Sequence, residues 1–538
     1  FSEKTNLFPL YVKMRYMKVL FFRNKVISFS LLFVAAVVFL TACGTNKSAT
    51  EQSQTTLTFP LQLSPTPTEL SSVSETLSGA SKYYEKRPNY MPGEPVDYIV
   101  QPGDTVSALA SRFNTTQSEI LKANPIIPAV TTTLPPGMPM KIPIYYRSQW
   151  GSPFRILPDS LFANGPAQIG FSARSFVDRQ PGWFKYFTAY TGEQNRRGGE
   201  IVDYIATTYS ISPRLLLALL EYQTGALTQK HRPEGINTNS VFGFTDVNSK
   251  QLTAQLNKLS NYLNNYYYEY REGRELEYQL LDGSLYRIDP WQNATTAALQ
   301  HYFAMIDPPN EFFYAIGPNG FQATYIALFG EIEDHPDYIP GSLTQPKFTL
   351  PFKEGDSWAF TGGPHPGWGD GAPNSAIDFA PPSSASGCVP SDEWVRVPAG
   401  GTIVRTDTGV AVLDLDDDKD ERTGWNIFFL HLLTSSIPPV GTRLNTGDAI
   451  GHPSCDGGTS TGTHFHIARK FNGEWISAGG IIPFEFDDWK VENGTSAYSG
   501  KLKRYSSTVI ACECADYTSI IHNGPPLVPT PTSTVKPK

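Results

Sequence analysis

His464 and His466, separated by one residue, are the side chains in this sequence whose types and spacing most directly indicate chemistry. In a β-strand, residues two apart point to the same face, so both imidazoles can reach one site. Upstream, His365 and Asp378 flank a Gly/Pro-rich stretch, and His431 lies in an apolar segment typical of a buried strand. A catalytic zinc takes three nitrogen or carboxylate ligands from the protein and keeps a fourth position for water. His365, Asp378 and His466 meet this requirement.

The order of these residues resembles that of a known enzyme family. A His and Asp pair, then Leu-His-Leu, then His-x-His, is similar to the lysostaphin-type and LytM-type zinc endopeptidases, which cut peptidoglycan cross-bridges. The resemblance covers about residues 348–514, including a Gly-rich strand at 397–404 and a Gly-rich turn at 440–451. It implies an antiparallel all-β zinc peptidase domain, which we expect at 346–520, with Zn²⁺ as its cofactor.

The first metal ligand departs from the common pattern of this family. Most members place it four residues before the Asp, where this chain has Asn374, and a neutral amide is a poor zinc ligand. His365 lies thirteen residues before Asp378, a spacing similar to that of the staphylolysin branch of the family. We therefore expect His365 to be the ligand. The alternative is a loop histidine beside an inactive site.

The resemblance also implies catalytic roles for His431 and His464. The sequence has no zincin-type helix that would supply a Glu as general base. One of the two histidines would take a proton from the attacking water, and the other would stabilise the oxyanion or protonate the leaving amine. The sequence does not assign which histidine has which role.

Four of the five cysteines lie in the expected peptidase region: Cys388, Cys455, Cys512 and Cys514. An exported protein can form disulfides, and these four allow three pairings. We favour a Cys388–Cys455 disulfide, because Cys388 follows the expected carboxylate ligand and Cys455 precedes the histidine pair, so that a bridge would brace the cleft. Cys512 and Cys514 would then pair with each other. Zinc binding by the thiols is disfavoured, since no CxxC pair occurs.

The N-terminal part of the sequence resembles a bacterial lipoprotein signal. Residues 1–16 are interpreted as upstream translation, because Met17 opens a basic segment followed by an apolar run at 26–40. The signal at 17–43 ends in Leu-Thr-Ala-Cys-Gly, which resembles a lipobox and implies lipidation of Cys43 and attachment to a membrane. An uncleaved anchor is the alternative. In both cases the protein is expected to be extracytoplasmic, with the Ser/Thr/Pro-rich residues 44–95 as a flexible linker.

Residues 96–145 are predicted to form a small βααβ domain that resembles a LysM domain. A strand and turn around Tyr98 precede two short helical segments and a closing strand at 140–144. LysM domains bind glycans containing N-acetylglucosamine, and the resemblance implies a set of glycan contacts: Gly103, Asp104, Thr105, Asn124, Pro125 and Ile126. Asp104 and Thr105 also suit the cap of the first helix, and both roles can hold together.

The middle region, 146–345, is predicted to be mostly α-helical. Helical spacing occurs at 200–209, 213–224, 251–270 and 295–306. Residues 210–225 weakly resemble the helix of lysozyme-like transglycosylases, but Gln223 stands where that family has its catalytic Glu, and an amide cannot act as a general acid. Glu221 does not replace it, because two residues along a helix turn a side chain by about 200°. A plain amphipathic core helix is the alternative.

Length and charge limit the classes of function. A chain of 538 residues indicates several domains, and a net charge of −8 with a pI near 5.7 gives no electrostatic basis for binding nucleic acid. The acidic run at 414–421 is interpreted as a solvated hairpin loop, because it lacks the Gly and Glu of a calcium loop. The tail at 521–538 is expected to be disordered.

Three hypotheses of different classes follow. The first is a lipid-anchored zinc endopeptidase that cuts peptidoglycan peptides and is guided by its LysM domain. The second is a non-catalytic LytM-like activator or scaffold for another wall hydrolase. The third is a glycan-cleaving transglycosylase, which Gln223 disfavours. The sequence does not say which peptide bond is cut, nor whether the wall is the cell's own.

Overall fold

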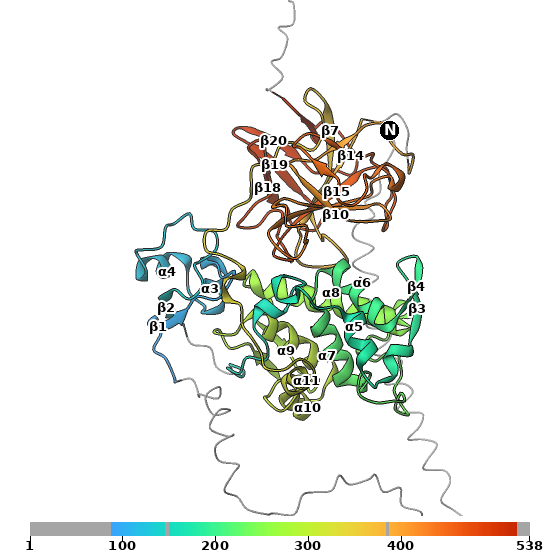
Figure 1. Ribbon diagram of the computed structural model, residues 1–538. Coiled ribbons are helices and arrows are strands. Elements are labelled where there is room, and N and C mark those ends of the chain that lie inside the picture. The colour runs from blue at the N-terminus through green and yellow to red at the C-terminus, as the bar shows by residue number, and fades with distance from the viewer. Residues whose placement is uncertain (1–87, 146–149, 383–386, 525–538) are drawn as a thin grey trace, which may run out of the picture. The chain divides into compact units, whose positions relative to one another are not determined.

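The computed structural model describes residues 88–145, 150–382 and 387–524 (Figure 1). All of these residues belong to one compact unit. The expected signal at 17–43, with Cys43, and nearly all of the expected linker lie outside the described residues. Among the described helices, none combines the length and apolar character needed to cross a membrane.

The N-terminal domain has the βααβ order expected for LysM. Its two antiparallel strands enclose two short helices: β1 (Glu94–Ile99), α3 (Val106–Arg112), α4 (Gln117–Ala123) and β2 (Pro139–Ile144). Thr105 caps α3 and Thr116 caps α4, each through a side chain that accepts a backbone N–H. Apolar side chains from all four elements form one core, including Tyr98, Leu109, Phe113, Ile120 and Ile142.

The middle region is helical, as the sequence predicts. Its helices are α5 (Ala173–Arg179), α6 (Gly198–Tyr209), α7 (Pro213–Thr224), α8 (Leu252–Arg271), α9 (Ala294–Ile306), α10 (Pro309–Ala315) and α11 (Phe321–Phe329). Two small hairpins accompany them, β3 (Thr188–Thr191) with β4 (Gln194–Arg197), and β5 (Glu277–Gln279) with β6 (Leu285–Arg287). Four helices match the predicted segments closely, because their apolar residues recur on one face and are buried, as with Leu252, Leu256, Leu259 and Leu263 of α8.

The C-terminal region is built on a nine-stranded antiparallel sheet within the described residues. The strands follow the order β13 (Arg443–Leu444), β10 (Gly401–Asp407), β11 (Val410–Asp414), β12 (Trp425–Leu430), β15 (Phe465–Phe471), β8 (Ala376–Ala380), β7 (Ser357–His365) and β21 (Ile520–His522), with β16 (Glu474–Trp475) on β15. A second sheet contains β17 (Glu485–Phe486), β18 (Trp489–Asn493), β19 (Gly500–Arg504) and β20 (Ser507–Ile510), and β9 (Val395–Arg396) pairs with β14 (Ala449–Gly451). The antiparallel all-β prediction is confirmed.

The two faces of the large sheet pack in two different cores. Ile377, Phe429 and Ile467 point into a core shared with the second sheet, including Phe484 and Val491. Their immediate neighbours point the opposite way, since side chains alternate along a strand. This opposite face belongs to the apolar cluster of the helical region, through residues that include Ala376, Val412, Phe428 and Ala468. Asp378 and His466 are spaced two residues from Ala376 and Ala468 and therefore lie on the helical side.

Two details differ from the sequence predictions. The predicted disordered tail at 521–538 is wrong for its first residues, because β21 pairs with β7 and buries Ile521 completely. The acidic run does form the loop of the β11–β12 hairpin, but its ends are not solvated. Asp414 is buried, and the Glu421 side chain, only 13% exposed, is paired with Arg405 and Lys470.

Candidate active site

Four adjacent strands of the large sheet bring the predicted site residues together. His365 ends β7, Asp378 lies in β8, His466 lies in β15, and His431 directly follows β12. Asp378 and His466 are direct cross-strand partners, and His365 lies opposite Ala376. Because directly opposed and diagonal side chains on one face lie within reach of one another, this register gathers residues separated by up to about a hundred positions.

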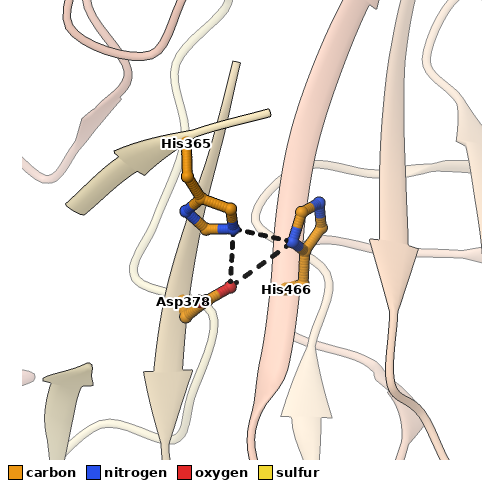
Figure 2. Close-up of side chains that lie close together, drawn as sticks. All are labelled: His365, Asp378 and His466. Carbon is orange, nitrogen blue, oxygen red and sulfur yellow. Dashed lines mark hydrogen bonds and ion pairs between the residues drawn. The ribbon is translucent and has the colours of Figure 1, made fainter. Parts of the chain in front are cut away.

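Three atoms that could bind a metal ion converge on one buried point (Figure 2). His365 Nε2 lies 3.0 Å from His466 Nδ1, and Asp378 Oδ1 lies 3.3 and 3.4 Å from these two nitrogens. Each of the three residues is at most 6% exposed. This is the trio that the sequence predicts as metal ligands.

The hydrogen bonds behind these atoms show that the trio suits a metal ion. His365 Nδ1 donates to the carbonyl oxygen of Gly363 at 2.8 Å, and His466 Nε2 donates to that of Gly367 at 3.1 Å. A carbonyl only accepts, so these outer nitrogens carry the hydrogens, and in the neutral imidazoles the inner nitrogens present lone pairs. Asp378 Oδ1 is buried and accepts no hydrogen bond within the described residues. Two nitrogen lone pairs and a carboxylate oxygen facing one another match the His and Asp donors of a catalytic zinc.

The pKa shifts in the trio are consistent with metal ligation. Burial acts to raise the pKa of Asp378, but His365 and its neighbouring imidazoles lower it well below its usual range, so the carboxylate is ionised. Burial lowers the pKa of His466, which favours the neutral imidazole. Burial also acts to lower the pKa of His365, but the Asp378 carboxylate outweighs it and raises that pKa. A metal ion at His365 would therefore compete with a proton.

The two predicted catalytic histidines lie beside the trio. His431 and His464 have ring centroids 4.6 Å apart, and His464 Nε2 is 3.9 Å from Asp378 Oδ1. Their Nδ1 atoms donate to the carbonyls of Asp456 and Gly462, so in the neutral imidazole each presents Nε2 as an acceptor. Burial, together with His464 and His466, lowers the pKa of His431 to about 4. His431 is thus neutral near pH 7 and able to accept a proton.

His431 also has an unusual backbone. Its φ is +64°, in the left-handed region that residues other than Gly rarely occupy. Its carbonyl accepts hydrogen bonds from the backbone N–H and the hydroxyl of Ser454, which hold this conformation. The turn directs the imidazole from the end of β12 into the site rather than along the strand.

The site opens into a cavity of about 430 Å³. Besides the residues already described, its lining includes the 459–463 loop, Tyr498 and Glu513. Tyr498 stacks on His365 with ring centroids 4.2 Å apart. The sequence gives no spacing that singles out Tyr498 or Glu513. The nearest signal for Glu513 is its position between two cysteines.

The structure contains both disulfides that the sequence favours. Cys388 pairs with Cys455, with their Cα atoms 5.5 Å apart, and Cys512 pairs with Cys514. Glu513, between the two cysteines of the second pair, lines the cavity. The backbone N–H and the hydroxyl of Thr463, in the lining loop, donate to the carbonyl of Gly387, next to Cys388. The first disulfide therefore joins two segments that border the site.

Asn374 is outside the trio, as expected. It precedes β8, and its backbone carbonyl accepts a hydrogen bond from the N–H of Ala478. No side-chain hydrogen bond of Asn374 occurs within the described part of the chain.

The expected glycan contacts of the LysM domain fall into two groups. Asp104 is buried between Arg112 and Tyr98, 2.9 and 2.6 Å away, and Thr105 caps α3, so both have structural roles. The side chain of Asn124 is bonded to the backbone at Ile120 and Lys141. Gly103 borders a second cavity, and Pro125 and Ile126 are exposed. Glycan binding by these residues stays a prediction.

The helical region shows no arrangement for cleaving glycans among the residues the sequence singled out. Gln223 lies near the side chain of Tyr302. Glu221 accepts hydrogen bonds from Leu227 N–H and from the Thr228 hydroxyl, at 2.6 and 2.5 Å, and so closes the turn after α7.

Comparisons with known proteins agree with this reading of the chain. Residues 98–143 match the LysM domain family, and residues 155–340 match the family described as the LasA N-terminal domain. Protease LasA of Pseudomonas aeruginosa is 25% identical over 379 residues, which cover 65% of this chain and 81% of that protein. The beta-lytic metalloendopeptidase of Lysobacter enzymogenes is 27% identical over 178 residues, covering 31% of this chain and 90% of the relative.

Solved structures give weaker similarities. The M23 metalloprotease pseudoalterin, described as coming from the deep sea, is 22% identical, with a TM-score of 0.27, and covers 31% of this chain and 96% of its own. TM-scores this low support no functional conclusion. The sequence relatives confirm the predicted metalloendopeptidase, in a chain whose N-terminal parts match the LysM and LasA N-terminal domain families and whose C-terminal region is similar to named metalloendopeptidases.

Proposed function

We propose that the protein is an extracytoplasmic zinc metalloendopeptidase that hydrolyses peptide cross-bridges of peptidoglycan. The observation that carries the proposal is the buried convergence of His365 Nε2, Asp378 Oδ1 and His466 Nδ1, with two further imidazoles directed at the same cavity. When bound, zinc would lower the pKa of a water molecule towards about 7 and polarise the scissile carbonyl. The same cavity would receive the peptide.

The protein's own residues would hold the ligands and move protons. The carbonyls of Gly363 and Gly367 fix the tautomers of His365 and His466. His431, whose pKa is about 4, is an acceptor at neutral pH, and His464 lies beside it with its Nδ1 held by the carbonyl of Gly462 and its Nε2 left for the reaction. One of the two would take the proton of the attacking water, and the other would stabilise the oxyanion or protonate the leaving amine.

The substrate and the location rest on the domain composition. A LysM domain would bring the enzyme to N-acetylglucosamine-containing glycan, with Gly103, Asp104, Thr105, Asn124, Pro125 and Ile126 as the proposed contacts. Relatives named protease LasA and beta-lytic metalloendopeptidase support an extracellular or cell-envelope enzyme. Attachment to a membrane through lipidated Cys43 is part of the proposal and rests on the sequence of the signal.

The alternative is a non-catalytic activator or scaffold, which would not need a complete set of donors. The chain has all three metal donors and both proton-transfer candidates, and this favours the enzyme. The third hypothesis, a glycan-cleaving transglycosylase, rests on the weak lysozyme-like resemblance of 210–225. It is disfavoured because Gln223 stands where that family has its general acid.

Mass analysis of digested peptidoglycan separates these functions. New free amines that disappear with a chelator, and that an Asp378→Asn variant does not produce, are the result expected of the endopeptidase. Unchanged wall with a zinc-loaded wild-type protein would favour the scaffold and contradict the proposal, as would anhydro-sugar ends. Wild-type protein should also hold about one zinc per chain.

A further inference from the structure

Helix α8 of the LasA-type domain contacts the loop that connects two of the proposed metal ligands. The side-chain oxygen of Asn261 accepts the backbone N–H of Asp370 at 2.7 Å, and that of Asn265 accepts the N–H of Ala372 at 2.9 Å. Asn261 and Asn265 are four residues apart and so lie on one face of the helix. The loop, residues 366–375, runs from His365 to β8, which carries Asp378.

Two glycines make this contact close. Gly369 and Gly371 have φ of +74° and +89°, where Gly is favoured. A Cβ at Gly369 would lie 2.2 Å from Asn261 Oδ1, and one at Gly371 would lie 2.3 Å from Asn265 Oδ1. The loop therefore has both the conformation and the absence of side chains that this helix face requires.

The same loop orients a third ligand. The carbonyl of Gly367 accepts the hydrogen of His466 Nε2 and thereby leaves Nδ1 as the donor to a metal. A Cβ at Gly367 would lie 2.3 Å from Ser375 Oγ and 2.9 Å from the Trp475 ring. Trp475 is in turn fixed by the helical region, since its backbone N–H donates to the Tyr268 hydroxyl of α8 at 2.9 Å.

We infer that Asn261 and Asn265 are positioning residues for the metal site, acting through the 366–375 loop. The LasA-type domain thus contributes to metal affinity in the intact chain, although its residues do not line the site cavity in the described structure. The inference rests on the proposed function, because it requires His365, Asp378 and His466 to bind zinc.

The test is the zinc dissociation constant of the full chain, measured by competition with a chromophoric chelator. An Asn261→Ala/Asn265→Ala variant should bind zinc about 10-fold more weakly, at the low end of the effect of outer-shell partners. The control is Asn257→Ala, one helical turn earlier, whose side chain has no hydrogen bond in the described structure. The Asn261→Asp/Asn265→Asp variant keeps both acceptors and should restore most of the affinity.

A second pair of variants approaches the contact from the loop. Gly371→Ala combines backbone strain with the collision at Asn265, whereas Gly355→Ala has similar strain at φ +92° with no atom within 4 Å of its Cβ. Only Gly371→Ala should weaken zinc binding, again by about 10-fold. The visible spectrum of the cobalt-substituted protein should change in the same variants, which a purely structural loss of stability would not produce.

The outcomes separate this inference from the proposed function. If wild-type protein binds zinc and the Asn261/Asn265 and Gly371 variants match their controls within about twofold, the positioning role is wrong and the metal site stands. If wild-type protein binds no zinc, both proposals fail.

Discussion

At the scale of single residues, strand register explains how His365 can take the place of the usual first ligand. Its position thirteen residues before Asp378 suggests a loop that must fold back. In the structure His365 is instead the last residue of β7 and lies opposite Ala376 in a β7–β8 pair. His365 and Asp378 are therefore diagonal neighbours on one face, and the intervening loop has only to close the hairpin.

The first prediction compares His365 with Asn374. His365→Ala should lose zinc because it removes one of three donors, whereas Asn374→Ala should keep it, since an amide is a weak ligand and Asn374 lies outside the trio. Metal content after gel filtration is the measurement. Full zinc in His365→Ala would show that another residue completes the site.

The second prediction concerns proton transfer. His431→Ala and His464→Ala should each retain zinc but lose at least about 100-fold in turnover, the usual scale for an acid or base group. His452→Ala is a matched control, because His452 also donates Nδ1 to a backbone carbonyl but does so to Glu393, outside the cavity. Near-normal turnover in either site variant would exclude that histidine from the mechanism.

At the scale of elements, one ion cluster fastens the strands on the helical side of the sheet. Glu421, at the end of the β11–β12 loop, accepts from Arg405 Nε of β10 at 2.6 Å and from Lys470 Nζ of β15 at 2.8 Å. Burial acts to raise the pKa of Glu421, but Arg405 and Lys470 lower it to about 2. Burial and Arg405 lower the pKa of Lys470, although Glu421 raises it.

The third prediction follows from this pKa. The folded-state value is below the unfolded value of about 4.3, so the stabilisation is present above about pH 4.3 and is lost as the pH falls towards 2. The difference between a folded-state pKa of about 2 and an unfolded-state pKa of about 4.3 corresponds to about 3 kcal/mol of unfolding free energy. Denaturant unfolding at several pH values should show this loss in the wild type and a flatter profile in Glu421→Gln, which is less stable at pH 7. If the stabilities of the two proteins fall in parallel as the pH is lowered, protonation of Glu421 does not contribute to acid unfolding.

The sequence predicts elements well where periodicity decides them. The helix at 213–224 is bounded as predicted, because Ser212 caps it, Pro213 starts it and Gly225, with φ of +62°, ends it. The strand at 520–522 was not predicted, because three residues beside a Pro-rich tail are too few to show a strand pattern. The ligand trio could be predicted from residue types and from the family resemblance. Tyr498 could not, because its stacking on His365 depends on where the second sheet lies.

At the scale of the whole molecule, a buried ion pair links the helical region to the large sheet. Arg271 of α8 and Glu474 of β16 are 2.6 Å apart and nearly unexposed. The hydroxyls of Tyr267 and Tyr338 donate to the same carboxylate oxygen at 2.5 and 2.6 Å. Arg271 and Glu474 are about two hundred positions apart, and no sequence pattern connects them. The pair could not be predicted without knowing how the two segments pack.

The fourth prediction tests that link. Glu474→Ala leaves the Arg271 guanidinium buried without its carboxylate and should cost about 3–5 kcal/mol of unfolding free energy. An Arg271→Met/Glu474→Leu variant removes both charges and should be much closer to wild type. Equilibrium denaturation of the three proteins is the measurement. Equal losses in the single and double variants would mean that packing, rather than an unpaired charge, sets the cost.

The backbone carbonyls that orient the imidazoles have a consequence for how this sequence can vary. A carbonyl is present whatever side chain the residue carries, so the tautomer of His464 does not depend on the identity of residue 462. A Cβ at Gly462 would meet no atom closer than 3.9 Å, and substitutions there leave the acceptor in place. Removing one residue from the 459–463 loop would instead displace that carbonyl by about 3.3 Å, a full residue of extended chain. The identity of residue 462 is therefore free to vary over generations, whereas the length of the loop is not.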